Sequence, residues 1–179
     1  MWKWQNNKKL EYEYIFKQLD KENVKYLLIG GTAVILHGVP RNTADVDFML
    51  NMDRDNLLRF IKAMKILGYQ PKVPVPPEEF ADPAKRKEWQ EEKNMIVFSF
   101  QHPDDPFMII DIMINSPIDF EAAYLRRKVI AKWGTQVSLA SIEDIIKLKE
   151  IAGRKQDLSD IALLRRVEKL DNECAEASL

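Results

Sequence analysis

The chain has 179 residues, of which 46% are hydrophobic and 31% are charged, and its formal net charge is −1. This balance is ordinary for a globular protein with one core, and it argues against a protein that coats nucleic acid through bulk positive charge. The single cysteine, Cys174, excludes a disulfide framework within the chain and any zinc site with the usual cysteine and histidine spacing.

The N-terminal half is predicted to alternate helices and strands. Hydrophobic spacing indicates an amphipathic helix over 6–22, whose polar start lacks the apolar core of a signal peptide. The apolar run 24–30 ends at Gly30-Gly31 and is typical of a strand followed by a tight turn. We expect a short buried helix over 32–38, a second strand over 45–51 and a helix over 53–69.

The next segment, 71–93, contains five prolines, which break regular structure, and its charged end 84–93 is predicted to be helical. It is either a mobile lid over a site or a long solvated excursion that Trp89 packs down. Further along, the pattern predicts strands over 95–100 and 107–115, a helix over 120–128, a strand or short hairpin over 129–140, a helix over 141–153 that a Ser141–Asp144 capping box begins, and a last helix over about 157–170.

This order predicts a single domain over 1–179 of the α/β or α+β class, with a short mixed sheet flanked by helices. The core is expected over 24–140, followed by a C-terminal helical segment over 141–170. No run approaches the ~18 apolar residues of a membrane span. We therefore expect a cytoplasmic protein without a membrane partner.

Two aspartates interrupt the second predicted strand. Alternate side chains of a strand share a face, so Asp45 and Asp47 point the same way, about 7 Å apart by strand rise. Ionised carboxylates so close repel each other, and a hard divalent cation such as Mg²⁺ removes the repulsion. Asp111, alone among apolar residues in 107–115, completes a three-carboxylate cluster if the two strands are neighbours. Such a cluster is able to hold two metal ions at a phosphoryl-transfer site.

The acids suit a cation, whereas the glycine pair suits an anion, because its bare backbone gives phosphate room to approach. Gly30, Gly31 and Thr32 open a helix whose N-terminus offers free N–H groups, and Arg41 and Thr43 add a charge and a hydroxyl. Taken singly, these features are also explained by a solvated strand edge, an ordinary turn or a satisfied buried acid. Together they favour a site for metal and nucleotide.

These residues resemble the signature of the nucleotidyltransferase superfamily that includes DNA polymerase beta. The signature is an apolar residue with two glycines, here Ile29-Gly30-Gly31, then thirteen residues, then Asp45-Val46-Asp47-Phe48. The stretch 30–48 is most similar to small bacterial enzymes related to abortive-infection toxin nucleotidyltransferases. The resemblance covers roughly residues 24–165, and the second glycine is an accepted variant of a serine.

The resemblance implies a nucleotidyltransferase fold and a two-metal mechanism, with two Mg²⁺ ions or Mn²⁺ in their place. Asp45 and Asp47 would bind metal and triphosphate, and Asp111 would help to activate the acceptor hydroxyl. A nucleoside monophosphate would pass from an NTP to a hydroxyl of RNA, a protein or a small molecule, and pyrophosphate would leave. The three aspartates are the expected catalytic and metal-binding residues.

The resemblance extends to the helix 141–153 and the residues after it. Helical spacing places Lys149 on the apolar face of this helix, whereas Lys147 points away. A lysine there either meets an anion, which makes it a candidate nucleotide-binding residue, or extends along the helix to water. Asp157 is also well placed to cap the last helix. The positions that match relatives of the toxin type are Lys149, Arg154, Lys155, Asp157 and Asp160.

Other chemistry has less support. His37, on the short buried helix, is expected to be a packed residue, and His102 is expected to lie in a turn. Neither has a nearby serine or cysteine with which to form a hydrolase triad. No P-loop is present. The basic run 126–128 is either a solvated helix end or a contact to an RNA acceptor. Two alternatives stay open: a non-catalytic nucleotide-binding module, as one half of a toxin–antitoxin pair with a small protein partner, and an antibiotic-adenylylating enzyme with its acceptor below 71–93.

Overall fold

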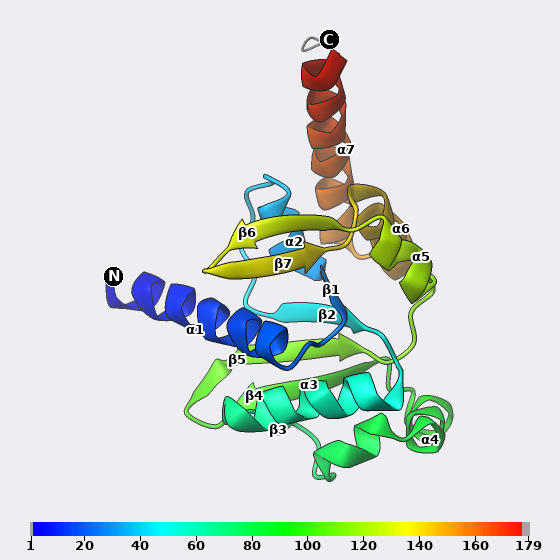
Figure 1. Ribbon diagram of the computed structural model, residues 1–179. Helices are drawn as coiled ribbons and strands as arrows, with labels where there is room; N and C mark the ends of the chain where they lie inside the picture. The colour runs from blue at the N-terminus through cyan, green and yellow to red at the C-terminus, as the bar shows by residue number, and fades with distance from the viewer. Residues whose placement is uncertain (1, 177–179) are drawn as a thin grey trace.

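A mixed β-sheet forms the centre of the protein, whose computed structural model describes residues 2–176 (Figure 1). Its strands are β1 (Tyr26–Ile29), β2 (Val46–Leu50), β3 (Gln70–Pro71), β4 (Val97–His102), β5 (Asp105–Met113), β6 (Lys128–Lys132) and β7 (Thr135–Leu139). The helices are α1 (Trp2–Lys21), α2 (Gly30–Leu36), α3 (Arg54–Ile66), α4 (Pro83–Lys93), α5 (Phe120–Leu125), α6 (Ile142–Ala152) and α7 (Lys155–Glu176), with a 3₁₀ turn, η1, at Pro77–Ala81.

The strand order across the sheet is β3-β4-β5-β2-β1-β7-β6. β1 pairs antiparallel with β2 and parallel with β7, and β2 pairs parallel with β5. The remaining neighbours, β3–β4, β4–β5 and β6–β7, are antiparallel. The predicted α/β class with a mixed sheet is therefore confirmed. The hairpin alternative for 129–140 is also confirmed, since Trp133 and Gly134 both take the positive φ values that a tight hairpin turn needs.

One face of the sheet is closed by aromatic packing. Phe48 of β2 contacts Phe16 of α1 and Phe60 of α3, with ring centroids 5.9 and 6.3 Å apart. Phe60 in turn meets Phe100 of β4 at 5.8 Å. Along β4 and β5, and around Asp47 in β2, these fully buried residues alternate with less buried ones, as the period of a strand requires. The less buried set therefore faces the other side, which is the partly open face of the sheet.

The proline-rich segment packs on the closed face rather than extending into solvent. Phe80 of η1 and Trp89 of α4 both stack on Phe98 of β4, with ring centroids 4.7 and 5.2 Å away. The side chain of Asp82 caps α4 by accepting the Ala84 N–H at 2.8 Å. Of the two interpretations of 71–93, the structure agrees with the one in which Trp89 packs the segment down.

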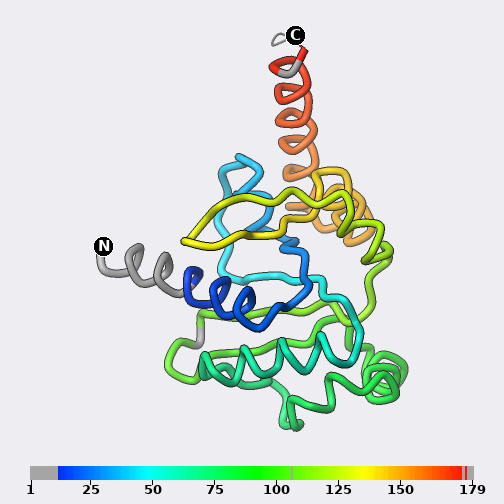
Figure 2. Tube along the Cα trace, in the orientation of Figure 1, coloured from blue at the N-terminus to red at the C-terminus, as the bar shows by residue number. Residues whose placement is uncertain are grey.

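Several predicted boundaries were wrong by a few residues. α2 begins at Gly30 instead of 32, α5 ends at Leu125 instead of 128, and α7 covers Lys155–Glu176 instead of 157–170. Ser141 does begin α6, because its hydroxyl accepts the Asp144 N–H at 3.1 Å. The C-terminal half of α7 extends away from the sheet (Figures 1 and 2). No helix in the described part of the chain is long and apolar enough to cross a membrane.

Substitution of Trp89 tests whether the segment 71–93 is docked on the closed face of the sheet. Trp89 is 2% exposed, so Trp89→Ala removes a buried indole and should lower the free energy of unfolding by about 3–5 kcal/mol. Urea denaturation followed by circular dichroism measures this. The control is Ile96→Ala at a side chain that is 70% exposed, which should stay within ~0.5 kcal/mol of wild type. Equal small effects for both variants would show that the segment is not docked.

Candidate active site

The three predicted aspartates come together on the partly open face of the sheet. β2 and β5 are neighbours, and Asp47 lies directly opposite Asp111 in their parallel pairing. Paired residues of adjacent strands project from the same face. Asp45 immediately precedes β2 rather than lying within it, and two residues before Asp47 it adds its charge on the same side. The strand adjacency that the cluster required is therefore present.

Asp47 is the acid whose ionisation the fold opposes most clearly. Burial raises its pKa to about 6, and the charges of Asp111 and Asp45 push the pKa in the same direction. A hydrogen bond from the Gly31 backbone N–H and the charge of Lys149 act against this rise. Asp47 is thus held in place by a backbone donor while its negative charge is only partly compensated.

Asp111 has an oxygen that no protein group uses. Burial raises the pKa of its carboxyl, a hydrogen bond from the Ser99 side chain lowers it, and Asp45 raises it again. Lys72 and Arg154 are also close enough to lower the pKa of Asp111. Its Oδ1 is buried and has no hydrogen-bond partner among the described residues. A buried carboxylate oxygen without a donor is costly, and a cation or a hydroxyl proton would relieve the cost.

The donor set fits a hard divalent cation. Such ions take carboxylate oxygens and water, and here the charges of Asp111 and Asp45 add to the burial that raises the pKa of Asp47, while the charge of Asp45 adds to the burial that raises the pKa of Asp111. Within residues 2–176 no group of three or more acid, histidine or cysteine side chains is arranged to hold a metal ion by itself. If a metal binds on this face, Asp45, Asp47 and Asp111 are the acids that could hold it, with its remaining ligands supplied by water or substrate.

The two glycines make room for protein side chains. Gly30 has a φ of +64°, and a Cβ there would lie 2.0 Å from Oδ2 of Asp47. A Cβ on Gly31 would lie 2.6 Å from Oγ1 of Thr43 and 3.0 Å from Cζ of Arg41. The sequence predicts phosphate in this space, whereas the structure fills it with Asp47, Thr43 and Arg41.

Thr32 supports the site through the backbone. Its hydroxyl donates to the carbonyl oxygen of Asp45 at 3.1 Å, and its side chain is buried. Since Asp45 stands just outside β2, this bond replaces part of the strand pairing that would otherwise hold it. In this structure the Thr32 hydroxyl positions an acid, and its predicted contact to nucleotide stays a prediction.

Arg41 and Lys149, the two basic residues that the sequence predicts to bind nucleotide, belong to a buried ion cluster. Lys149 donates from Nζ to Asp157 at 2.9 Å and to Asp160 at 2.6 Å, and Arg41 contacts the same Asp160 oxygen at 2.5 Å. The placement of Lys149 on the buried face of α6, with Lys147 exposed, is confirmed. The anion that Lys149 meets is supplied by α7, so the cluster fastens that helix beside Asp47.

Asp157 is not the N-cap residue that the sequence predicted for the last helix, but its side chain does cap the start of that helix from the third helical position. α7 begins at Lys155, so Asp157 lies in its first turn and accepts the backbone N–H of Arg154 at 3.1 Å. Its carboxylate satisfies one free donor of the helix and also binds Lys149. The side chain of Arg154 itself has no ion-pair partner among the described residues.

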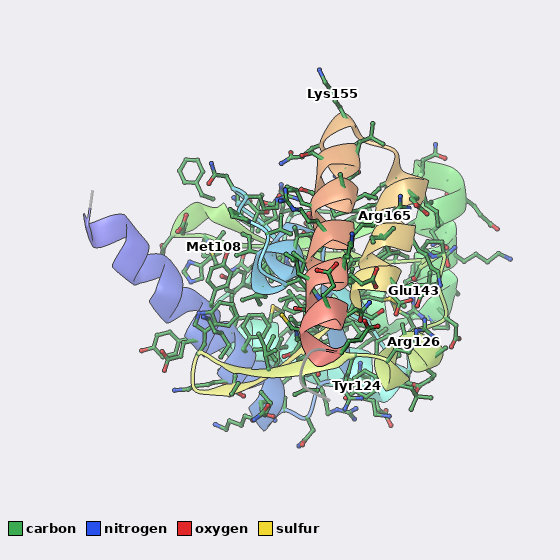
Figure 3. All side chains as sticks on the ribbon, turned by 90° about the horizontal axis from the view of Figure 1, so that it is seen from above. Met108, Tyr124, Arg126, Glu143, Lys155 and Arg165 are labelled. Atoms are coloured by element: carbon green, nitrogen blue, oxygen red, sulfur yellow. The ribbon has the colours of Figure 1, made fainter. Side chains whose placement is uncertain are left out.

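The basic run is already occupied by protein contacts. Arg126 binds Asp144 at 2.6 Å, and it lies close to Glu143 (Figure 3). Arg127 donates to the Tyr124 carbonyl at 2.7 Å and stacks its guanidinium 3.8 Å from the centroid of that ring. Arg126 thus contacts α6 and Arg127 contacts α5. These contacts favour the interpretation of the basic run 126–128 as a helix end.

The histidines take no part in the site. Nε2 of His37 lies 2.8 Å from the Ala140 carbonyl, and burial lowers its pKa, as expected for a packed residue. His102 is the last residue of β4 and not part of the turn. Two surface hollows, of about 730 Å³ at the β6–β7 hairpin and about 520 Å³ along 65–77, both lie away from the aspartates.

Sequence reasoning missed Ser99 and Lys72. Ser99 lies opposite Asp111 in the β4–β5 pairing, and the Lys72 backbone N–H donates to the Ser99 carbonyl at 2.9 Å. The signal for Ser99 was present, because it is a polar residue in the otherwise apolar stretch 95–100. Lys72 had no such signal, since only the pairing of β3 with β4 brings it next to Ser99.

Comparison with known proteins places the chain among nucleotide-transferring enzymes. Residues 10–177 match the family described as "Nucleotidyltransferase of unknown function (DUF6036)". No curated protein sequence matches the chain. Among solved structures, the lincosamide antibiotic adenylyltransferase LnuA with lincomycin bound is similar with a TM-score of 0.57 and 18% identity, over 89% of this chain and 96% of that one.

Two further structures share the architecture. ANT(2")-Ia in complex with adenylyl-2"-tobramycin has a TM-score of 0.56 and 16% identity, and the match covers 97% of this chain and 99% of that one. An antigenic nucleotidyltransferase-like protein from Paracoccidioides brasiliensis has a TM-score of 0.53 and 19% identity, over 87% and 74%. At these identities the likeness shows the fold, which is the nucleotidyltransferase fold that the sequence predicted.

The raised pKa of Asp47 gives a pH-dependent prediction. The pKa rises from 3.8 to about 6 on folding, so the folded state binds more protons in this window and its stability falls as the pH rises through it. Asp47→Asn removes the ionisation and should stabilise the protein above pH ~6 by on the order of 1–3 kcal/mol. The gain should vanish near pH ~4, where Asp47 is protonated as well.

Urea titrations at several pH values, with chelator present, measure this difference. The exposed Asp55→Asn should show no such pH-dependent gain. An Asp47→Asn difference that is the same at both ends of the range would contradict the burial and repulsion assigned to Asp47.

The ion cluster predicts that Lys149 stabilises the protein without any nucleotide. Lys149→Gln would leave Asp157 and Asp160 buried with one cation fewer, and should lower the free energy of unfolding by about 3–5 kcal/mol. Lys147→Gln is the matched control, since its pair with Glu143 is exposed on the same helix, and it should cost less than ~0.5 kcal/mol. If the two variants unfold alike, Lys149 has no structural role.

Proposed function

The chain belongs to the DUF6036 family of nucleotidyltransferases, and we propose that it transfers a nucleoside monophosphate from an NTP to an acceptor hydroxyl at Asp45, Asp47 and Asp111. The observation that carries this proposal is the pairing of Asp47 with Asp111 on parallel neighbours of the sheet, on the partly open face. It brings the two acids of the paired motif together with the third acid from a distant part of the chain.

Asp45 and Asp47 would hold the divalent metal, Mg²⁺ or Mn²⁺. A metal bound there supplies positive charge to the triphosphate and to the oxygen that leaves with pyrophosphate. The Gly31 N–H and the Thr32 hydroxyl keep the two acids in position, through the carboxylate of Asp47 and the backbone of Asp45 respectively. Because these supports are short and buried, the acids need little rearrangement when substrate binds.

Asp111 would act as the general base. Its raised pKa makes the carboxylate more basic than an exposed aspartate, and its Oδ1 is the oxygen that no protein donor occupies. The acceptor hydroxyl gives its proton to this oxygen as it forms the new bond to the α-phosphorus. The bond from the α-phosphorus to the bridging oxygen breaks, and pyrophosphate carries that electron pair away.

The nucleotide would lie on the Gly30–Gly31 side of the aspartates. We infer that Thr32, Thr43, Arg41 and Lys149 line this side, with the two cations already oriented by Asp157 and Asp160. Arg154 immediately precedes the first residue of α7, Lys155, which points away from the fold in Figure 3. Since its guanidinium is unpaired among the described residues and its charge reaches Asp111, Arg154 is the cation best suited to contact the triphosphate.

The test is incubation of the protein with each labelled NTP, Mg²⁺ and a cell extract, followed by separation of RNA, protein and small molecules. Asp45→Ala, Asp47→Ala and Asp111→Ala should each reduce labelling by roughly 10³-fold or more, because each removes a metal ligand or the base. Asp55→Ala, at an exposed position of α3, should change it less than about twofold. Undiminished labelling by the three variants would refute the proposal.

A further inference from the structure

A row of polar residues crosses β2, β5 and β4 on the partly open face and ends at Lys72, the residue that follows the edge strand β3. Asp47 is opposite Asp111, Asp111 is opposite Ser99, and Lys72 continues the β3–β4 pairing opposite Ser99. Residues in register on neighbouring strands project from the same face. The row therefore reads Asp47, Asp111, Ser99, Lys72 from the middle of the sheet to its edge.

The two ends of this row lie in different surroundings. The Asp47 end adjoins Gly30, the ion cluster and the start of α7, where the nucleotide is proposed to lie. The Lys72 end is the edge strand β3, beyond Asp111. If Asp111 removes the acceptor proton, then the rest of the acceptor extends over Ser99 towards Lys72. This assignment of sides rests on the function proposed above.

Lys72 brings a positive charge to the acceptor side. Its side chain is exposed and forms no ion pair among residues 2–176, and its charge reaches Asp111. The other paired side chains of this face on β3 to β5 contribute amides and apolar surface, and they are Gln70, Val97, Gln101, Ile109 and Met113. Asp105, at the start of β5, lies beyond a register shift and pairs with His102.

The charge selects the class of acceptor. An acceptor carrying ammonium groups would meet the positive charge of Lys72, and the carboxylate nearest to Lys72 in the row is the reacting Asp111, whereas a phosphate would find an ammonium that forms no ion pair among the described residues. Two strand spacings, ~10 Å, separate the backbone of Lys72 from that of Asp111. This distance accommodates a sugar whose hydroxyl lies at Asp111 and whose phosphate reaches Lys72.

We propose that the acceptor is a hydroxyl-bearing molecule with a phosphate group close to that hydroxyl, and that Lys72 binds this phosphate. The terminal ribose of an RNA and a free sugar phosphate both present this chemistry. Lys72 is a specificity-determining residue in this proposal, and the transfer step is unchanged. A bound phosphate would gain a charge-assisted hydrogen bond, worth a tenfold to hundredfold change in acceptor affinity.

The experiment compares wild type, Lys72→Glu, Lys72→Arg and the control Lys87→Glu. Lys87 is also an exposed lysine, and it lies on α4, the helix that packs through Trp89 on the closed face. The acceptors are a short single-stranded RNA with a free 3′ hydroxyl, ribose 5-phosphate, unphosphorylated ribose and an aminoglycoside. Label from the NTP is followed in each, and the KM is determined for acceptor and for NTP.

We expect label in the RNA or in ribose 5-phosphate, and the productive arm identifies the source of the phosphate. Lys72→Glu should raise the KM for that acceptor at least tenfold and change the KM for NTP less than twofold. Lys72→Arg should retain most of the affinity, and Lys87→Glu should behave as wild type. Label in the aminoglycoside or in ribose, or an acceptor KM that Lys72→Glu leaves unchanged, would overturn the proposal.

A binding measurement separates this inference from the proposed function. Fluorescence anisotropy with the labelled RNA, and calorimetry with ribose 5-phosphate, are carried out without NTP. Weaker binding by Lys72→Glu than by Lys87→Glu supports the phosphate site even if no NTP labels any acceptor, a result that would count against the transfer reaction alone. Equal binding by these two variants refutes the phosphate site while leaving transfer at the aspartates intact.

Discussion

The site depends on the parallel pairing of β2 with β5. This pairing joins the paired acids of one segment to an acid more than sixty residues later in the chain, and it does so in register, so that Asp47 and Asp111 meet. A shift of one residue would turn one of these acids into the closed aromatic face. The packing of Phe48, Phe60 and Phe100 on that face therefore does more than stabilise the fold, because it fixes which residues reach the open side.

Three like charges in such a place require supports from several elements. A backbone N–H of Gly31 binds Asp47, the Thr32 hydroxyl holds the backbone of Asp45, and the Ser99 side chain binds Asp111. Each support removes freedom from an acid without neutralising it. Burial and the remaining repulsion raise the pKa of Asp47 and of Asp111, and a cation or a substrate proton can relieve this cost.

Local patterns in the sequence predicted the elements and the acids well. Hydrophobic periodicity and the glycines and prolines that end elements were enough to predict the strand, glycine turn, helix and strand of 24–51. Periodicity alone placed Lys149 on the buried side of α6. The partners of these residues were harder to predict, because pairing between distant segments leaves no periodic signal. Asp160 as the partner of Arg41, and Lys72 at the end of the acid row, are consequences of how α7 and β3 dock.

The glycine turn shows the same limit in another form. A pair of glycines predicts a sharp turn, but the sequence does not say whether the vacated space is for a ligand or for the protein itself. Here Asp47, Thr43 and Arg41 occupy it. What was predicted as a phosphate cradle is at least as much a packing requirement of the motif acids.

The ion cluster of Arg41, Lys149, Asp157 and Asp160 has a consequence for the order of events during synthesis. The ribosome releases the N-terminal part of a chain first, so β1, α2 and β2 can assemble while α7 is still being made. Arg41 then has no Asp160 to bind until the ribosome has added more than a hundred further residues. The acids are placed early, and α7 closes the cluster only after it has been made, so a product truncated before α7 would carry the motif without its restraints.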